Sequence, residues 1–352
     1  AAYFGKLPDQ DSPGDVATQH WIATGVILFT VALLLSGKSI ELVLERLSWG
    51  MIVFIFTFLI VVNILFVPWS DWRSTIEGFT GLQRTRGELD IVLLAVFAAT
   101  AGSGGLGNLA ISNWFRDKGF GMGALSGGIG NALAGDHSQV RPIGTTFPTT
   151  PENMRRWRVW WRYAVLDQVA LWAFGCILGM FLNVNLAATL IPADESLTGI
   201  GAGTYQAEYM AKKLWSGFWV LALLNGFWIL FSTHLGNTDV LVRIVSDISW
   251  VAFPRIRKWP VSRFYATLLL LLTVWAVYAV RIGTVLQLFE VLGVVACPIM
   301  SIGAIQILRV NTRFLPPELR PPMWRRIGLG LCSAAYGGLA IALIVKLLRD
   351  LK

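Results

Sequence analysis

The polar residues with the clearest capacity for chemistry interrupt a long apolar run. The run begins at Leu89. The segment Gly102–Asn108 (GSGGLGN) interrupts it with four glycines, and its polar residues are Ser103 and Asn108. Each glycine costs a helix about 1 kcal/mol relative to alanine. In lipid, the backbone groups freed by such a break are tolerated only where they face protein or a water-filled cavity. Secondary transporters hold ions and substrates at breaks of this kind, so the segment predicts a binding site near the membrane midplane.

A second interpretation is that the glycines only allow neighbouring helices to pack closely. Close-packing glycines are spaced four residues apart, whereas those of Gly102–Asn108 are nearly consecutive and have polar neighbours. The pattern therefore favours a site. Its expected ligands are backbone oxygens around Gly105 and the amide oxygen of Asn108, with Ser103 on the substrate pathway.

Glu290 is the main candidate for charge chemistry inside another apolar run. An ionisable group at the bilayer centre costs at least about 2.5–3.5 kcal/mol, so such a group is a functional candidate by default. Gln287 precedes Glu290 by three residues and shares its helix face. Two roles for Glu290 have equal weight: a ligand for a cation, or a packing residue hydrogen-bonded to a neighbouring helix.

Two further ionisable residues border apolar runs. Asp90 lies at the expected outer end of the broken run, where we expect it to control entry to the site. His234 follows the fifth run. A histidine in such a position is more often a hydrogen-bonded structural residue than a ligand. The chain has no nucleophile–base pair and no HExxH motif to support a membrane enzyme that uses His137 or His234. We therefore expect no catalytic residues and no permanently bound cofactor.

The composition places these residues in a membrane. The 352 residues are 55% hydrophobic and only 14% charged, whereas soluble domains carry roughly 25% charged residues. The chain is thus expected to be an all-α integral membrane protein. Its net charge of +8 comes mostly from arginines in loops, which does not indicate nucleic-acid binding. The cysteines lie singly in apolar runs and predict neither a metal site nor disulfides.

About eight membrane-spanning helices are expected at roughly twenty residues per crossing. The fifth runs into a polar tail, Ser232–Asp239, where we expect the helix to loosen. All the spans are expected to form one transmembrane domain over residues 1–352. The expected spans are Trp21–Gly37, Trp49–Pro68, the broken Leu89–Phe115, Trp160–Leu190, Leu214–Phe231, Phe264–Val280, Gly283–Leu308 and Ile327–Leu348.

The arginines and lysines of the loops predict the orientation of the spans. They concentrate after the first, third, fifth and seventh spans, so every second loop is expected in the cytoplasm and residue 1 outside. The first twenty residues are polar and form no signal peptide. An outside start without a signal is explained if an odd number of upstream spans precedes this sequence.

The order of these features resembles the Nramp family of divalent-metal transporters, from that family's fourth helix to its end. Gly37-Lys-Ser-Ile-Glu41 is similar to the link between the family's fourth and fifth helices. Gly105-Leu-Gly-Asn-Leu-Ala-Ile-Ser112 falls where the broken sixth helix carries Met-Pro-His-Asn-Leu-Tyr-Leu-His. Ser232, Thr233 and Gly236 resemble the Ser-Ser-Thr-x-x-Gly motif of the eighth helix. Pro298 resembles the proline of the tenth helix.

The resemblance implies a LeuT-like inverted-repeat bundle and proton-coupled symport of a divalent metal ion across the cell membrane, the inner membrane in a prokaryote. Gly105 stands where the family has its metal-binding methionine, and the family's Asp-Pro-Gly-Asn motif is not in this sequence. Loss of the thioether removes the ligand that favours softer metals. A metal site of Gly105, Asn108 and Glu290 would favour Mg²⁺ or Mn²⁺. The alternatives are transport of another solute, a non-transporting scaffold, or a membrane enzyme.

Overall fold

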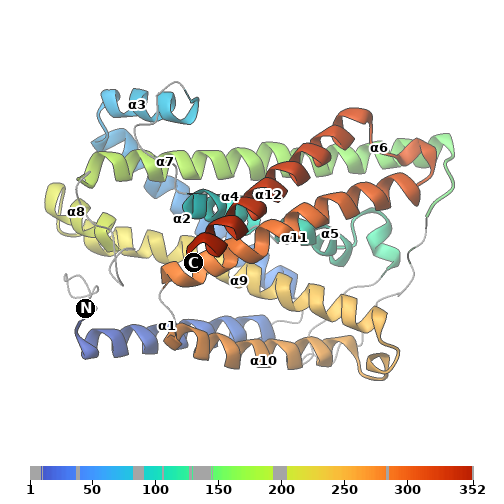
Figure 1. Ribbon diagram of the computed structural model, residues 1–352, viewed down its shortest axis with the longest axis horizontal. Helices are drawn as coiled ribbons and strands as arrows, with labels where there is room; N and C mark the ends of the chain where they lie inside the picture. The colour runs from blue at the N-terminus through green and yellow to red at the C-terminus, as the bar shows by residue number, and fades with distance from the viewer. Residues whose placement is uncertain are drawn as a thin grey trace. The chain divides into compact units, whose positions relative to one another are not determined.

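The computed structural model describes residues 9, 11–36, 40–81, 91–104, 107–126, 129, 144, 146–192, 204–282 and 285–350 (Figure 1). The described chain is 88% helical, and this part of it contains no strand. Its main helices are α1 (Pro13–Ser36), α2 (Ile40–Phe66), α3 (Trp69–Phe79), α4 (Ile91–Gly104), α5 (Gly107–Asp117), α6 (Pro151–Val165), α7 (Phe174–Leu190), α8 (Tyr205–Lys213), α9 (Phe218–Ala252), α10 (Val261–Ile282), α11 (Val285–Arg313) and α12 (Met323–Asp350).

Seven helical segments in the described chain are long and apolar enough to cross a membrane. They coincide with all of the expected spans except the broken one, which is represented by the shorter apolar helix Ile91–Thr100. The prediction of an all-α, multi-pass membrane protein is therefore confirmed at that level. The reason is simple: a membrane span needs about twenty consecutive apolar residues, and such runs stand out in the sequence.

The helix between Pro151 and Leu190 is continuous but changes its geometry in the middle. Pro151 opens α6, a position where its missing N–H costs no hydrogen bond. Between α6 and α7, the residues Leu166–Ala173 form a π-helical segment, η3. In a π-helix each N–H bonds to the carbonyl five residues back, so the turns are wider than those of an α-helix.

The predicted loosening after Phe231 is wrong, because α9 runs unbroken for 35 residues through Ser232–Asp239. The hydroxyls of Ser232 and Thr233 both donate to the Ile229 carbonyl, each at 3.0 Å. These side chains therefore use acceptors of their own helix, and the polar sequence does not end the helix. At about 1.5 Å per residue, α9 is roughly 52 Å long and exceeds a bilayer core of about 30 Å.

The chain divides into two compact units. Unit 1 contains Ala1–Arg86, Gly128–Val140 and Tyr163–Thr284, and unit 2 contains Gly87–Gly127, Arg141–Arg162 and Val285–Lys352. The residues of the predicted break and Glu290 fall in unit 2, whereas His234 falls in unit 1. That residues 1–352 form a single transmembrane domain stays a prediction.

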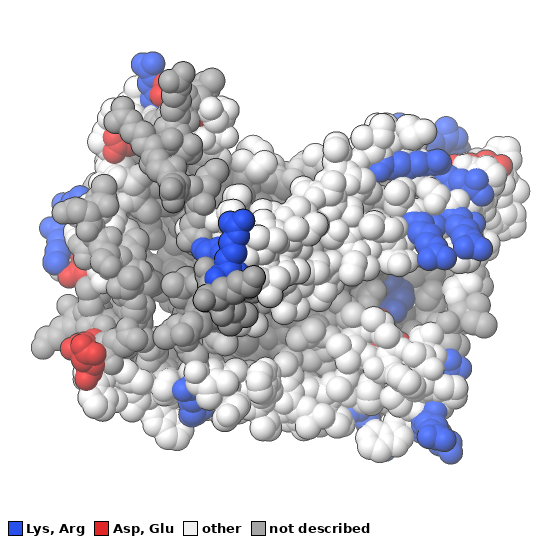
Figure 2. Space-filling view, in the orientation of Figure 1, with Lys and Arg blue, Asp and Glu red and all other residues white. Residues whose placement is uncertain are grey.

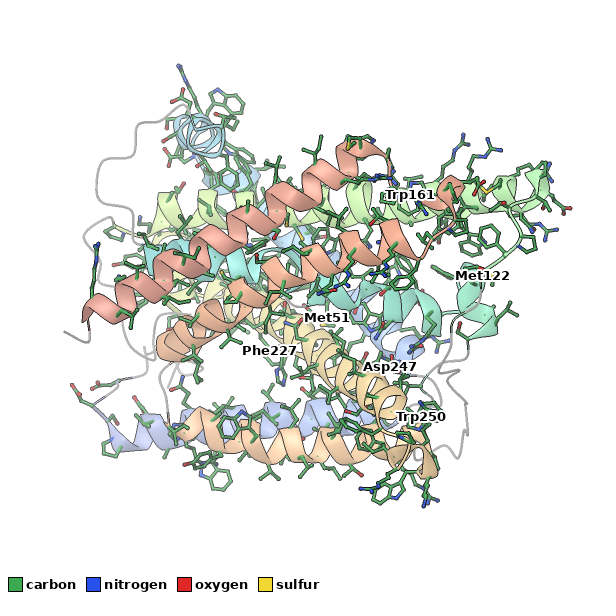
Figure 3. The ribbon with its side chains drawn as sticks, turned by 45° about the vertical axis from the view of Figure 1, so that its right-hand side comes forward. Met51, Met122, Trp161, Phe227, Asp247 and Trp250 are labelled. Atoms are coloured by element: carbon green, nitrogen blue, oxygen red, sulfur yellow. The ribbon has the colours of Figure 1, made fainter. Side chains whose placement is uncertain are left out.

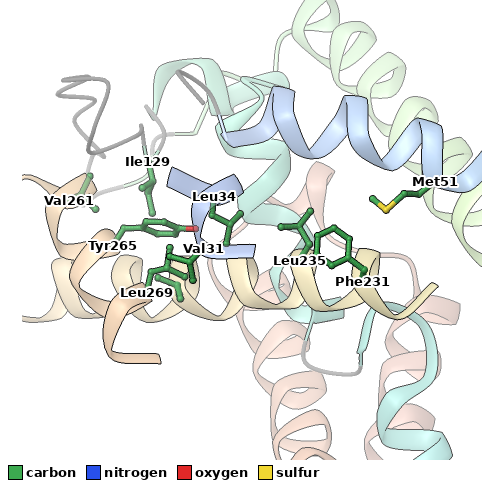
Figure 4. Close-up of a cluster of buried hydrophobic side chains, with 10 residues drawn as sticks. Val31, Leu34, Met51, Ile129, Phe231, Leu235, Val261, Tyr265 and Leu269 are labelled. Carbon is green, nitrogen blue, oxygen red and sulfur yellow. The ribbon is translucent and has the colours of Figure 1, made fainter. Parts of the chain in front are cut away.

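Unit 1 has two buried apolar clusters. One joins α1, α2, α9 and α10 and includes Leu34, Phe231, Leu235 and Leu269, with Tyr265 entering from α10 (Figure 4). The other joins α2, α7 and α8. Its buried members are Leu59, Val62, Val67, Leu182, Leu186, Leu190 and Met210.

The buried cluster of unit 2 is built from smaller side chains. It joins α4, α11 and α12 and contains Ala95, Ala99, Ala296 and Cys297, all fully buried. Small residues let helix backbones approach closely, which is the usual way that helices associate in a membrane. This close packing positions α4, the helix that leads to the predicted break.

Candidate functional site

The glycine-rich segment Gly102–Asn108 is shared between the ends of two short helices. α4 ends at Gly104 and α5 begins at Gly107, whereas Gly105 and Leu106 lie outside the described residues. Each helix is too short to cross a bilayer core alone: α4 has 14 residues and α5 has 11. The predicted bounds of the break, Gly102–Asn108, are wrong: Gly102–Gly104 continue α4, and Gly107 and Asn108 already belong to α5, because a few glycines at a helix end do not stop its hydrogen bonding. A break at Gly105 and Leu106 lies outside the described residues and stays a prediction.

Close contacts fix α4 against α11 and α12. A Cβ atom at Gly293 of α11 would lie 3.0 Å from Val96 Cγ2 and 3.3 Å from Val96 Cα, so only glycine fits there without a shift. The Cys297 thiol lies 3.7 Å from the Ala95 carbonyl oxygen. From α12, the Tyr336 hydroxyl donates to the Ala98 carbonyl at 3.0 Å. The backbone of α4 is therefore in contact with its neighbours up to the turn that precedes Gly102.

α5 packs on the same helix, α11. A Cβ atom at Gly303 would lie 3.0 Å from Leu109 Cδ1. At the far end of α5, Arg116 Nη2 lies 2.7 Å from Asp117 Oδ1, and the Asp117 side chain is buried. Gly119 then adopts a positive φ of 73°, which lets the chain turn directly after the helix.

These contacts define how α11 runs along the two short helices. Gly293 lies beside Val96 and Gly303 lies beside Leu109, so α11 runs in the same direction as α4 and α5. The part of α11 beside the predicted break is therefore the stretch between the two glycines, which contains Pro298.

This alignment of α11 along α4 and α5 also gives the distance between Glu290 and the predicted break. Its backbone lies one turn before Gly293, and Val96 lies eight residues before Gly104. At 1.5 Å per residue this places Glu290 roughly 16 Å from the break along the helices, farther than a glutamate side chain extends. The side chains of Asn108 and Glu290 lie outside the described ones, as does all of Gly105, so the metal set stays a prediction. This distance argues against Glu290 as a direct ligand at the break.

The predicted pathway residues are not brought together by the described chain. Asp90 and the side chains of Ser103 and Gln287 lie outside the described residues. His234 is half-buried on α9 in unit 1. Among the described residues, no group of three or more histidine, cysteine, aspartate or glutamate side chains is arranged to hold a metal ion.

A buried ion pair on α9 was not foreseen from the sequence. Arg243 donates to both carboxylate oxygens of Asp239, from Nη2 at 3.0 Å and from Nε at 3.2 Å, and both side chains are almost completely buried. The Tyr265 hydroxyl of α10 donates to Asp239 Oδ1 at 2.8 Å. The guanidinium of Arg243 also lies 6.0 Å from the centre of the Tyr265 ring. The spacing of four residues between Asp239 and Arg243 is the signal that sequence reasoning could have used.

Further buried polar residues share this face of α9. Asn225, Ser246 and Asp247 are all buried, and Figure 3 shows Asp247 near the end of the helix. The Oδ1 atom of Asn225 and the hydroxyl of Ser246 have no hydrogen-bond partner in the described chain. Since 225, 232, 239, 243 and 246 follow one another at intervals of seven, seven, four and three, they line one side of the helix.

A second polar network in unit 1 is fully hydrogen-bonded. The Asn185 amide of α7 donates to Asn63 Oδ1 of α2 at 3.0 Å, and the Thr75 hydroxyl of α3 donates to Asn185 Oδ1 at 2.8 Å. Asn63 in turn donates to the carbonyls of Leu59 and Leu182. This network ties three helices together and has the features of a structural contact. Its donors and acceptors satisfy one another, so it offers no free group to a ligand.

Comparison with known proteins found no family model, no curated protein and no solved structure that matches this chain.

Proposed function

We propose that the chain belongs to a secondary-active transporter of divalent metal ions, similar to the Nramp family and coupled to proton movement. The observation that carries the proposal is the pair of short helices α4 and α5. They follow one another in the sequence, are separated only by Gly105 and Leu106, and each contacts α11. In transporters, the ends of such half-helices present backbone oxygens and dipole charge to a substrate.

The proposed metal site is centred on Gly105–Asn108. Backbone carbonyls at the end of α4 and the Asn108 amide oxygen would supply hard oxygen ligands, which suit Mg²⁺ or Mn²⁺ better than softer ions. Glu290 would act at a distance from the site, as a charged residue on the route that the cation and the proton take. Asp90, Ser103, Gln287 and His234 remain candidates for that route.

Uptake by proteoliposomes tests the proposal. The protein made from its complete coding sequence is reconstituted, and Mn²⁺ entry and internal pH are followed with two dyes under an inward proton gradient. We expect Mn²⁺ entry that Mg²⁺ inhibits and that acidifies the lumen. We expect Asn108→Ala to reduce it about tenfold or more, because an oxygen ligand is lost. Gly338→Ala is the control, since a Cβ atom there meets nothing within 4 Å.

Absence of Mn²⁺ and Mg²⁺ movement in a folded, correctly reconstituted protein would end the proposal. The role of Glu290 is separated by Glu290→Gln, which keeps size and hydrogen bonding but removes the charge. If this variant keeps the wild-type rate and pH dependence, Glu290 is a packing residue. Loss of pH dependence with a retained Mn²⁺ affinity would support the proposed role of Glu290 on the route of the cation and the proton.

A further inference from the structure

Arginine side chains gather at one end of unit 2. They come from α6, the end of α11, the segment that links α11 to α12 and the beginning of α12, where they outnumber the carboxylates Glu152 and Glu318 (Figure 2). α11 and α12 are linked by the short segment 314–322, so these two helix ends lie at the same membrane surface. The arginines are Arg155, Arg156, Arg158, Arg162, Arg309, Arg313, Arg320, Arg325 and Arg326.

Arg325 is held by two tryptophans. Its guanidinium lies 4.3 Å from the ring centre of Trp161 on α6 and 4.8 Å from that of Trp324. The Trp161 ring also stacks on Trp157, with centroids 5.9 Å apart. Figure 3 shows Trp161 where α6 runs beside the start of α12. A guanidinium stacked on rings keeps the N–H groups at its edges available for other acceptors.

Two more arginines of α6 lie on the helix surface beside the tryptophan row. Arg158 and Arg162 are four residues apart, so they form a row on the helix surface next to the row of Trp157 and Trp161. Both arginines are exposed, and neither they nor Arg325 has a carboxylate partner in the described part of the chain. Glu152 pairs with a different arginine, Arg156, at 2.6 Å. Among the described residues, no carboxylate therefore pairs with the positive charge around Trp161.

We infer that this surface binds the phosphate headgroup of an anionic phospholipid, with Arg158, Arg162 and Arg325 as its ligands and Trp161 as its floor. Tryptophan rings prefer the headgroup level of a membrane. Arginine forms paired hydrogen bonds to phosphate oxygens. Basic surfaces between helices at the cytoplasmic side are suited to anionic headgroups. The inference does not depend on which ion the protein transports.

A competing explanation is that the arginines only orient the helices in the membrane, which requires positive charge but no defined geometry. Arg325→Lys separates the two explanations, because lysine keeps the charge but loses the planar stacking and the paired hydrogen bonds. Arg156→Lys is the matched control, since Arg156 lies on α6 and already has Glu152 as its partner.

Native mass spectrometry of the full-length protein measures the binding directly. We titrate dioctanoyl phosphatidylglycerol and, separately, dioctanoyl phosphatidylcholine into wild type and variants. We expect phosphatidylglycerol to bind at least about tenfold more tightly than phosphatidylcholine. Arg325→Lys should remove most of that difference, and Arg156→Lys should preserve it. If Arg325→Lys does not fold, Arg162→Gln provides a second test, because it leaves the stacked Arg325 in place. We expect Arg162→Gln to weaken phosphatidylglycerol binding several-fold.

Three outcomes would overturn the inference. The first is equal affinity for the two lipids in wild type. The second is an unchanged preference in the folded Arg325→Lys variant, or in Arg162→Gln where Arg325→Lys does not fold. The third is complete displacement of phosphatidylglycerol by an equal concentration of inorganic phosphate, which would identify a simple anion site and not a lipid site.

Discussion

Unit 1 and unit 2 hold their helices together by different chemistry. In unit 1, the hydrogen bond from Tyr265 to the buried Asp239 and the amide–amide hydrogen bond between Asn185 and Asn63 join helices through a few strongly interacting atoms. In unit 2, α4, α11 and α12 meet through glycines, alanines and serines, so their attraction is spread over closely packed backbone. The first kind of contact fixes one arrangement. The second brings helix backbones close together without tying them through individual charged groups.

Removing the carboxylate of the unit 1 ion pair should have the largest effect. Asp239→Ala leaves Arg243 buried without its main carboxylate partner and removes the acceptor of Tyr265, so we expect a loss of about 3–5 kcal/mol in unfolding free energy. Unfolding of the purified protein in mixed micelles measures it. The double variant Asp239→Ala/Arg243→Met should recover part of the loss. If it is no more stable than the single variant, the buried charge is not the cause.

The unit 2 interface should be most sensitive to added volume. Gly293→Ala places a methyl group against the backbone of Val96, so overpacking should destabilise the protein by about 1–3 kcal/mol. Gly338→Ala on α12 adds the same atom in open space and should be neutral or stabilising by up to about 1 kcal/mol. Equal effects of the two substitutions in the same unfolding assay would contradict the close approach of α4 and α11.

The amide network of unit 1 should contribute less than its ion pair. Asn185→Leu removes the partners of Asn63 and Thr75, and interhelical hydrogen bonds in membranes are worth about 0.6–1.7 kcal/mol. Asn183→Leu is the control on the same helix, because the Asn183 amide bonds only to the Gly179 carbonyl of its own turn. A smaller loss for Asn185→Leu than for Asn183→Leu would mean that the network does not join the helices.

The smallest effect is expected at the serine pair between α11 and α12. The Ser333 hydroxyl donates to the Ser301 carbonyl at 3.0 Å, and the Ser301 hydroxyl donates to the Ser333 carbonyl at 2.9 Å. Ser333→Ala removes one of these bonds and should cost about 0.5 kcal/mol. A double-mutant cycle with Ser301→Ala measures the coupling between the two side chains. A coupling above about 2 kcal/mol would show that unit 2, like unit 1, depends on concentrated polar contacts.

The sequence predicts the helices of this protein well because apolar runs of membrane length are unambiguous. It misjudges the polar part of α9, since the hydroxyls of Ser232 and Thr233 bond within the helix and do not interrupt it. The pairing of Asn63 with Asn185 joins residues 122 positions apart, and no local pattern reveals it.

The candidate site shows the same limit. Glycine content and polarity point to the region where α4 ends and α5 begins, but they overestimate the break, because Gly102–Gly104 and Gly107–Asn108 are helical. The distance between Glu290 and that break depends on which glycine of α11 meets which residue of α4, and only the folded chain supplies that register. Local composition therefore identifies elements, whereas the alignment of one element along another has to be observed.

The π-helical segment between α6 and α7 has a consequence for how this chain can vary. A π-helical turn contains about one residue more than the α-helical turn that it replaces. Loss of one residue within Leu166–Ala173 would tighten that turn and leave Trp161 and Asn185 facing their present partners. The same deletion within α7 would rotate Asn185 by about a quarter turn away from Asn63. The π-helical segment can therefore change its length without rotating the helices on either side of it. We expect natural insertions and deletions in this long helix to concentrate there.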